Sequence, residues 1–288
     1  MKANKKVVAA LALTLAAGAL PLQVGAQTTD TPERQVPGYS DTPRIPGTDW
    51  HVHDPNRPQP PMVEAGGAIA TPPPGDAIVL FNGENLDEWQ GPGGAPAHWT
   101  LADGAMTTPA PDAAARGSIS TREAFGDIQL HLEFMTPDPD EGTGQRRGNS
   151  GVFLMGRYEV QVLNSWDNPV YPDGQASALY GQRPPLVNAS APTGEWQSYD
   201  IVFEAPRFAE DGSLLSPAYV TVFHNGILTQ HRTPFQGGTV HRDVATYKPH
   251  APSAPITLQD HGQKVAYRNI WVRNLDLPAP QLVPQMRR

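Results

Sequence analysis

The chain has 288 residues, a formal net charge of −8 at pH 7, no cysteine and 32 prolines. An acidic chain without runs of basic residues is unlike proteins that bind nucleic acid or anionic membrane surfaces, so we expect neither as a partner. Without cysteine the fold gains nothing from disulfides and depends on the packing of its core.

Residues 1–26 have the pattern of a secretory signal peptide. Three lysines within the first six residues precede an apolar run that extends to Leu22, and small residues before Gln27 suit a cleavage site. The run is short for a membrane span and no second long apolar segment follows it, so we expect a periplasmic or secreted protein without a membrane anchor. Cleavage would leave 18 basic against 29 acidic residues, a net charge of −11.

Residues 27–76 form a proline-rich segment that differs from the rest of the chain. Such a composition cannot bury a core, so we expect an extended leader or a strap that lies along the domain; Ile45 and Trp50 favour the strap. His51 and His53 form a His-x-His pair of the kind that binds zinc. Prolines surround the pair and no strand precedes it, so we do not favour a metal site here.

From Ala77 onward, short strand-like runs follow one another, separated by Gly, Pro, Asn and Asp. The predicted strands are Ile78–Phe81, His98–Leu101, Ala105–Thr107, Ser118–Thr121, Ile128–Met135, Gly151–Met155, Tyr158–Leu163, Ser198–Ala205, Tyr219–His224, Ile227–Arg232, Pro255–Gln259 and Lys264–Asn274. Helical periodicity is absent apart from a short turn predicted around Leu86–Trp89. We therefore predict one all-β domain over residues 77–276, an antiparallel two-sheet jelly-roll sandwich, followed by a C-terminal tail at 277–288.

Turn chemistry and loop length add detail to this domain. Asn225-Gly226 and Asp103-Gly104 each separate two alternating runs and predict tight hairpins. Three longer loops, at 136–149, 164–195 and 233–254, are of a length that is usually functional. The polar and aromatic residues that suit a binding rim in these loops are Trp166, Asp167, Tyr171, Tyr180, His241, Tyr247 and His250.

Several strands pair an apolar face with a polar one. In Tyr158–Leu163 the polar face carries Glu159 and Gln161. The same alternation places His131 with Glu133 in one further strand, and Gln259 with His261 in and just after another. If these strands are neighbours in one sheet, their polar faces merge into a carbohydrate-type active site. The alternative is that they are ordinary solvated strand faces.

Two other side chains have open interpretations. The parity of the last strand places Arg268 on the core side beside Ile270, unless a bulge intervenes; a buried arginine would need an ion-pair partner or would clamp a substrate. Trp196 could stack on a sugar ring or belong to the core.

Nine segments in order resemble one family. They are Leu80-Phe81-Asn82-Gly83, Gly126-Asp127, Asn149-Ser150-Gly151-Val152-Phe153, Tyr158-Glu159-Val160-Gln161, Leu179-Tyr180-Gly181, Gly194-Glu195-Trp196-Gln197, Asn225-Gly226, Leu258-Gln259-Asp260-His261-Gly262 and Tyr267-Arg268-Asn269-Ile270. Over about residues 77–276 the chain resembles the 3-keto-disaccharide hydrolase domain.

The resemblance implies a concanavalin-like jelly roll and action on glycosides or disaccharides whose sugar a partner dehydrogenase has oxidised at C3. It implies Glu159, His261 and Arg268 as catalytic residues. The substrate-binding residues that we expect are Asn149, Gln161, Tyr180, Trp196, Gln259, Glu133 and His131.

The ketone makes the C2 proton acidic, so a base can remove it and the enolate can expel the group on C1; water then adds back, or does not if the enzyme is a lyase. Glu159 or His261 would be base or acid. Arg268, Gln161 or a divalent metal would hold the enolate oxygen.

Two further hypotheses stay open. A lectin-like sandwich can be a non-catalytic carbohydrate-binding module, which needs no base. Alternatively, Glu133 and Glu159 could form the carboxylate pair of a conventional glycosidase, in which case they would lie on opposite sides of one glycosidic bond.

Overall fold

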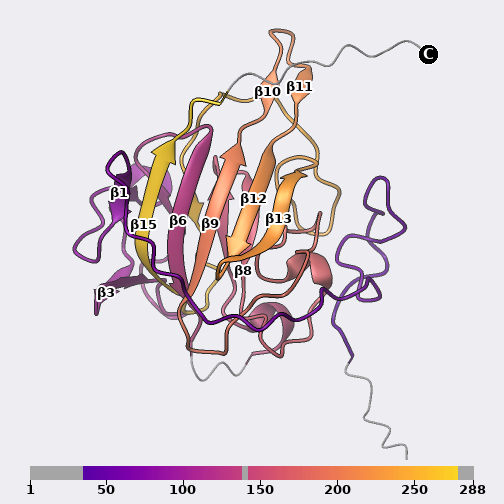
Figure 1. Cartoon of the computed structure of the whole chain (residues 1–288), viewed down its shortest axis with the longest axis horizontal. Coiled ribbons are helices and arrows are strands. Elements are labelled where there is room, and N and C mark those ends of the chain that lie inside the picture. Colours follow the sequence, from indigo (N-terminus) through magenta and orange to yellow (C-terminus); the bar gives the residue numbers. More distant parts are fainter. Residues whose placement is uncertain (1–34, 138–141, 278–288) are drawn as a thin grey trace, which may run out of the picture. The chain divides into compact units, whose positions relative to one another are not determined.

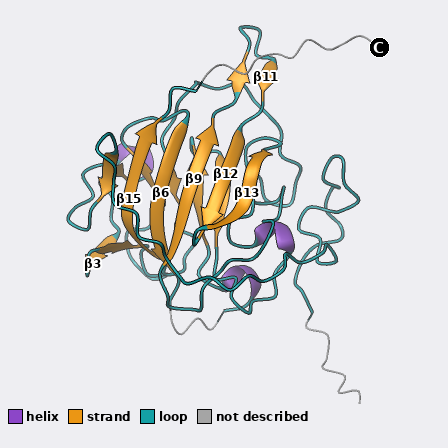
Figure 2. Ribbon diagram, in the orientation of Figure 1, coloured by secondary structure: helices purple, strands orange, loops and turns teal. Residues whose placement is uncertain are grey.

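The computed structural model describes residues 35–137 and 142–277, so the predicted signal peptide and all but the first residue of the predicted tail lie outside the described residues. Within that part, an eight-stranded and a five-stranded antiparallel sheet pack face to face, with a separate two-stranded ribbon (Figures 1 and 2). This two-sheet antiparallel jelly roll confirms the predicted fold class. None of the helices described there has the length and hydropathy to cross a bilayer.

The larger sheet has the order β13-β12-β9-β6-β15-β4-β3, and β1 also pairs with β15. Figure 1 shows β15, β6, β9, β12 and β13 side by side. The strands are β1 (Ile78–Phe81), β3 (Thr100–Ala102), β4 (Ala105–Thr107), β6 (Ile128–Met135), β9 (Gln197–Glu204), β12 (Tyr219–His224), β13 (Ile227–Pro234) and β15 (Ala266–Asn274).

The smaller sheet has the order β2-β5-β14-β7-β8 and carries the candidate site. Its strands are β2 (Trp89–Gln90), β5 (Ile119–Thr121), β14 (Thr257–Leu258), β7 (Ser150–Leu154) and β8 (Tyr158–Val162). The ribbon is β10 (Arg207–Phe208) with β11 (Leu214–Ser216), and three single 3-10 turns lie at Pro92–Gly94, Gly144–Arg146 and Pro172–Gly174.

The helical turn predicted around Leu86–Trp89 is instead one hydrogen-bonded turn, in which the Trp89 N–H donates to Leu86 O at 2.9 Å. Trp89 then enters β2 opposite Thr121. The indole is fully buried and donates to Leu80 O, so core packing sets the conformation here.

One hydrophobic core fills the space between the sheets. The inward residues of β6, such as Leu130 and Leu132, meet the inward residues of β8, such as Val160 and Val162. Because side chains alternate along a strand, the polar residues between them face outward, away from the partner sheet.

Both predicted hairpins are confirmed. Asn225 and Gly226 have φ of 51° and 77° between β12 and β13, and Asp103 and Gly104 have φ of 52° and 74° between β3 and β4. These left-handed pairs match the turn that Asn-Gly and Asp-Gly favour.

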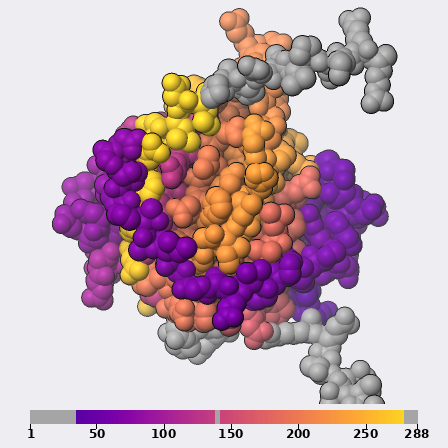
Figure 3. Space-filling view, in the orientation of Figure 1, coloured from indigo at the N-terminus to yellow at the C-terminus, as the bar shows by residue number. Residues whose placement is uncertain are grey.

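Residues 35–76, which we call the strap, lie against the sandwich. Residues 61–76 run across the outer face of the larger sheet, where Figures 1 and 3 show them as an indigo to purple band. There the Ala68 N–H donates to Trp196 O at 2.7 Å, and Thr71 O accepts hydrogen bonds from Asn269 and Trp271 at 3.1 and 2.9 Å. Residues 27–34 of the predicted leader lie outside the described residues.

Candidate active site

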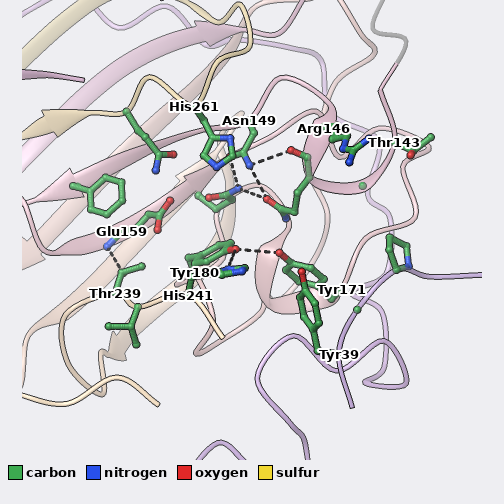
Figure 4. Close-up of a pocket in the computed structure, with 18 residues that line it drawn as sticks. Tyr39, Thr143, Arg146, Asn149, Glu159, Tyr171, Tyr180, Thr239, His241 and His261 are labelled. Carbon is green, nitrogen blue, oxygen red and sulfur yellow. Dashed lines mark hydrogen bonds between the residues drawn. The ribbon is translucent and has the colours of Figure 1, made fainter. Parts of the chain in front are cut away.

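A cavity of about 790 Å³ opens on the outer face of the smaller sheet. Strands β7 and β8 form its floor, and its walls come from residues 143–149, 171–180 and 239–241, from the stretch after β14, and from strap residues 37–39. Figure 4 shows Glu159 and Thr239 at one end of the lining, and Tyr39, Thr143 and Arg146 at the other. The three long loops that we predicted to be functional all contribute to these walls.

Glu159 is the one carboxylate among the described residues that line the cavity. Its neighbours Tyr158 and Val160 point into the core, so the alternation of β8 turns Glu159 to the cavity. The residue is only 3% exposed. Burial raises the pKa of Glu159 to about 8, because an ionised carboxylate loses its hydration there.

Gly151 makes room for this carboxyl group. On β7 it lies opposite Gln161. Phe153, two residues further along β7, lies opposite Glu159. A Cβ atom at position 151 would overlap Glu159 Oε1. Because Gly151 has no side chain, the neighbouring strand leaves the space that the Glu159 carboxyl group occupies.

Three amides form a network beside Glu159. The Gln161 Nε2 donates to Gln145 Oε1 and Asn149 Oδ1 at 3.0 and 3.1 Å, and the Asn149 Nδ2 donates to Gln145 Oε1 at 3.1 Å. In this arrangement the Gln161 amide oxygen faces the carboxyl group, and a hydrogen bond between them requires Glu159 to be protonated. Turned over, the Gln161 NH₂ donates to Glu159 Oε1 at 2.9 Å, which suits the ionised form. The Gln161 amide can thus serve both protonation states.

Gln259 and His261 approach the cavity from the segment after β14. The Gln259 N–H donates to Gly151 O at 3.0 Å, which fixes this segment beside β7. In the described structure Gln259 Oε1 is buried without a hydrogen-bond partner. His261 is exposed on the rim. An unpaired acceptor and an accessible imidazole leave this side of the cavity free to contact a ligand.

Aromatic residues line the opposite wall. The Tyr180 hydroxyl lies 3.0 Å from the Tyr171 hydroxyl and 3.2 Å from His241 Nδ1. Burial raises the pKa of Tyr180 well above its ordinary value, so the hydroxyl stays protonated. Partial burial, with the nearby His53, lowers the pKa of His241, so its imidazole is neutral near pH 7.

Comparison with known proteins places this geometry in a family. The model of the 3-keto-alpha-glucoside-1,2-lyase-like domain matches residues 76–273. The chain belongs to this family. The resemblance that the sequence indicated is therefore confirmed.

Relatives of this lyase-like domain are known in Bacteroides thetaiotaomicron and Parabacteroides distasonis. A 3-keto-disaccharide hydrolase of Bacteroides thetaiotaomicron is 22% identical over 249 residues, which cover 69% of this chain and 78% of the relative. A crystal structure from Parabacteroides distasonis, described provisionally as a glycosyl hydrolase, is 41% identical with a TM-score of 0.68 and covers 76% of this chain and 93% of its own. A second structure from that organism, at 19% identity and a TM-score of 0.51, covers 69% and 94% and supports the fold alone.

Not all predicted site residues of this lyase-like domain meet. Asn149, Glu159, Gln161, Tyr180, Gln259 and His261 line the cavity. His131, Glu133, Trp196 and Arg268 do not, because they belong to the outer side of the larger sheet.

The prediction that all these polar faces merge is wrong for β6. The inward residues of β6 and β8 share one core, so Glu133 and Glu159 face outward from opposite sides of the sandwich. The same fact overturns the hypothesis of a Glu133–Glu159 glycosidase pair, since no single glycosidic bond can lie between them.

Arg268 also departs from its predicted parity. The register of β15 against β6 shifts between Arg268 and Trp271, and Asn269 there has φ of 47°. This bulge turns Arg268 outward, where its Nε donates to Glu133 Oε2 at 2.7 Å and its guanidinium lies 4.0 Å above the Trp196 ring. Of the two predicted roles, an ion pair or a substrate clamp, the structure shows the ion pair. It lies outside the cavity, on the face of the larger sheet that the strap crosses.

The donor set does not suit a metal ion. Among residues 35–137 and 142–277 no three His, Cys, Asp or Glu side chains gather as ligands. In the His-x-His pair, His53 pairs with Asp173, whereas the His51 imidazole contacts Thr42 O. We therefore derive no chemical step through a metal.

Sequence reasoning missed Gln145, Tyr39 and the His53–Asp173 pair as parts of this region. Gln145 lies in the loop 136–149, whose length predicted a functional role. Loop length was therefore the signal in the sequence that could have identified Gln145. His53 and Asp173 are 120 residues apart in sequence, and nothing in the local pattern of either one predicts that they meet.

Proposed function

We propose that this protein is an exported enzyme that cleaves 3-keto-glycosides or 3-keto-disaccharides by elimination. The observation that carries the proposal is Glu159, a carboxyl group with pKa about 8 on the floor of a polar cavity. A group with a pKa near the working pH is well suited to take up and release protons. The family and the 3-keto-disaccharide hydrolase relative support the substrate class.

Glu159 is the base in this proposal. It takes the proton from C2, the electrons of that C–H bond form a C2=C3 double bond, and the charge moves to the oxygen on C3. A raised pKa makes the ionised carboxylate a stronger base than an ordinary glutamate, and the Gln161 amide can turn over to stabilise that ionised form.

The enolate then collapses. The C3 carbonyl re-forms, C1=C2 forms and the C1–O bond breaks, while the leaving oxygen takes a proton, for which we assign His261 on the rim. The amide groups of Gln161 and Gln259 can donate to the enolate oxygen, the role for which Arg268 is in the wrong place. Water adds to C1 and a proton returns to C2, which gives net hydrolysis; without this addition the enzyme is a lyase.

The substrate must arrive already oxidised. A ketone at C3 requires a sugar 3-dehydrogenase upstream, so we propose functional coupling to that class of enzyme. The signal-peptide pattern of residues 1–26 supports action in the periplasm or outside the cell.

A non-catalytic carbohydrate-binding module is the second candidate. The same cavity would hold a sugar, but a binder gains nothing from a buried acid whose desolvation costs stability. The two candidates differ in turnover, so one experiment separates them.

The test incubates the protein with matched 3-keto and unoxidised disaccharides in deuterated water and follows sugar release. We expect release from the 3-keto substrate alone, with deuterium at C2 of the product. Release from both substrates without label would contradict elimination, and tight binding without release would favour the binding module.

A further inference from the structure

The strap contributes to the cavity from outside the family domain, which begins at residue 76. Residues 37–39 line the cavity, and Tyr39 lies at the end away from Glu159 (Figure 4). We propose that Tyr39 contacts the second sugar ring of the substrate and makes the enzyme prefer 3-keto-disaccharides over 3-keto-glycosides with a small leaving group. The proposal rests on the proposed function.

The backbone around Tyr39 is held firmly. The Tyr39 N–H donates to His53 O at 2.9 Å. A Cβ atom at Gly38 would overlap the same carbonyl group and Pro55, so the two strap segments are in close contact. Arg44 and His51 form an antiparallel bridge within the same segment, so the strap holds Tyr39 by pairing with itself.

A buried pair ties this arrangement to the domain. His53 and Asp173 are both completely buried. The backbone N–H of His53 donates to one Asp173 carboxylate oxygen at 2.9 Å, and the ring Nδ1 lies 3.3 Å from the other oxygen. The His53 ring packs on Tyr171 and Tyr180, with centroids 4.2 and 4.7 Å apart. Because Tyr171 and Tyr180 line the cavity, the same contact positions the aromatic wall and the strap.

The Tyr39 ring itself has several side-chain neighbours. The Arg242 guanidinium lies 4.1 Å from its centroid and pairs with Asp41 at 3.1 Å. The Tyr39 ring also approaches Tyr171 and His241, with centroids 6.3 and 6.1 Å away. A ring held in this way offers a preorganised apolar surface to a ligand.

The cavity is large enough for more than one sugar ring. At about 790 Å³ it lies in the upper part of the ~300–1,000 Å³ range of pockets that hold drug-sized ligands. The oxidised ring must lie at Glu159, where its C2 proton is removed. The space toward Tyr39, Thr143 and Arg146 then remains for the leaving sugar, with one aromatic face and two polar side chains to contact it (Figure 4).

The test compares 3-keto-maltose, oxidised in the ring whose bond is cleaved, with methyl 3-keto-α-glucoside, which lacks the second ring. For Tyr39→Ala we expect kcat/KM to fall about three- to tenfold on 3-keto-maltose and to stay unchanged on the methyl glycoside. Tyr39→Phe should retain the wild-type ratio, because it keeps the ring. Trp50→Ala, in the same strap but outside the cavity, should change neither substrate.

A binding measurement separates this proposal from the proposed reaction. Calorimetry with Glu159→Gln, which does not turn over, should show the same three- to tenfold loss for 3-keto-maltose alone when Tyr39→Ala is added. That result without any cleavage by the wild type would defeat the reaction and retain the second-ring assignment. Equal losses on both ligands, no loss on either, or an equal effect of Trp50→Ala would overturn the assignment.

Discussion

The hydroxyl of Tyr199 donates a hydrogen bond of 2.7 Å to the backbone carbonyl of Gln161, across the sandwich from β9 to β8. The same hydroxyl accepts from the Ser177 N–H at 2.7 Å. Tyr199 is fully buried, and burial raises its pKa well above the ordinary value. A side chain of the larger sheet therefore holds β8, the strand that carries Glu159, from the core side.

Tyr199→Phe should destabilise the protein by about 1–3 kcal/mol, because it removes two buried hydrogen bonds, each of which contributes about 0.5–1.5 kcal/mol. The Gln161 carbonyl and the Ser177 N–H keep the bond of 2.9 Å that they make to each other. Thermal unfolding followed by circular dichroism measures this. Tyr219→Phe, on a partly exposed tyrosine of the same sheet, is the control and should change stability by less than about 0.5 kcal/mol. Equal melting temperatures for the two variants would contradict the inter-sheet role.

Glu159→Gln should stabilise the protein in a pH-dependent way. The pKa of Glu159 is raised from 4.5 to about 8 in the folded state, so the folded protein holds a proton that the unfolded chain releases between those values. Wild-type stability is then full below pH 4.5 and falls as pH rises toward 8, by up to about 1.4 kcal/mol per pH unit. The glutamine variant lacks this loss.

Denaturant unfolding at pH 5 and pH 8 tests the difference. The two proteins should be close at pH 5, and the variant should be more stable at pH 8. In the same variant, cleavage of a 3-keto-glycoside should fall about 10²- to 10⁴-fold. A variant that is no more stable at pH 8 would mean that Glu159 is not held in a desolvated site.

Gly151→Ala should reduce activity without unfolding the domain. Its methyl group would take the space of Glu159 Oε1 and push the carboxyl group away from Gln161. We expect kcat to fall by at least about tenfold, since small displacements of a catalytic group are costly. Gly66→Ala, where an added Cβ meets nothing within 4 Å, should be neutral in the same assay.

Glu133→Gln should have the opposite profile from Glu159→Gln. Glu133 pairs with Arg268 at 2.7 Å and accepts from Asn269 at 2.8 Å, so the substitution should cost about 1–3 kcal/mol of stability. Cleavage should persist, because Glu133 faces away from the cavity. Loss of turnover in a folded Glu133→Gln protein would return this residue to the active site.

The sequence predicts the strands well because alternation and turn chemistry are local. Glu159 and Gln161 share one strand, and their common face follows from its period of two. Asn225-Gly226 predicts its hairpin for the same reason. Alternation does not say which sheet a strand joins, so Glu133 in β6 has the same local pattern as Glu159 in β8 but lies on the other side of the molecule.

The position of Arg268 illustrates a second limit. One bulge at Asn269 moves the β15 residues before it to the opposite face of the sheet. The only sign of this bulge in the sequence is that asparagine tolerates a positive φ. The strap is a third case, since the contact of His53 with Asp173 joins segments that are 120 residues apart. Such pairings depend on the finished fold.

The contacts of the strap also order the events of folding. Its anchors are Asp173 for His53, Asn269 and Trp271 for Thr71, and Arg273 for Asp76, the last at a separation of 197 residues. During synthesis the strap emerges well before any of these partners, and Thr71 and Asp76 have no partners until β15 is made. Long-range contacts form late because their loop closure is expensive. The strap is therefore anchored in steps: His53 can pair once Asp173 is in place, whereas the part nearest the domain waits for β15. An interrupted chain that lacks β15 leaves Thr71 and Asp76 without these partners but keeps Asp173 for His53.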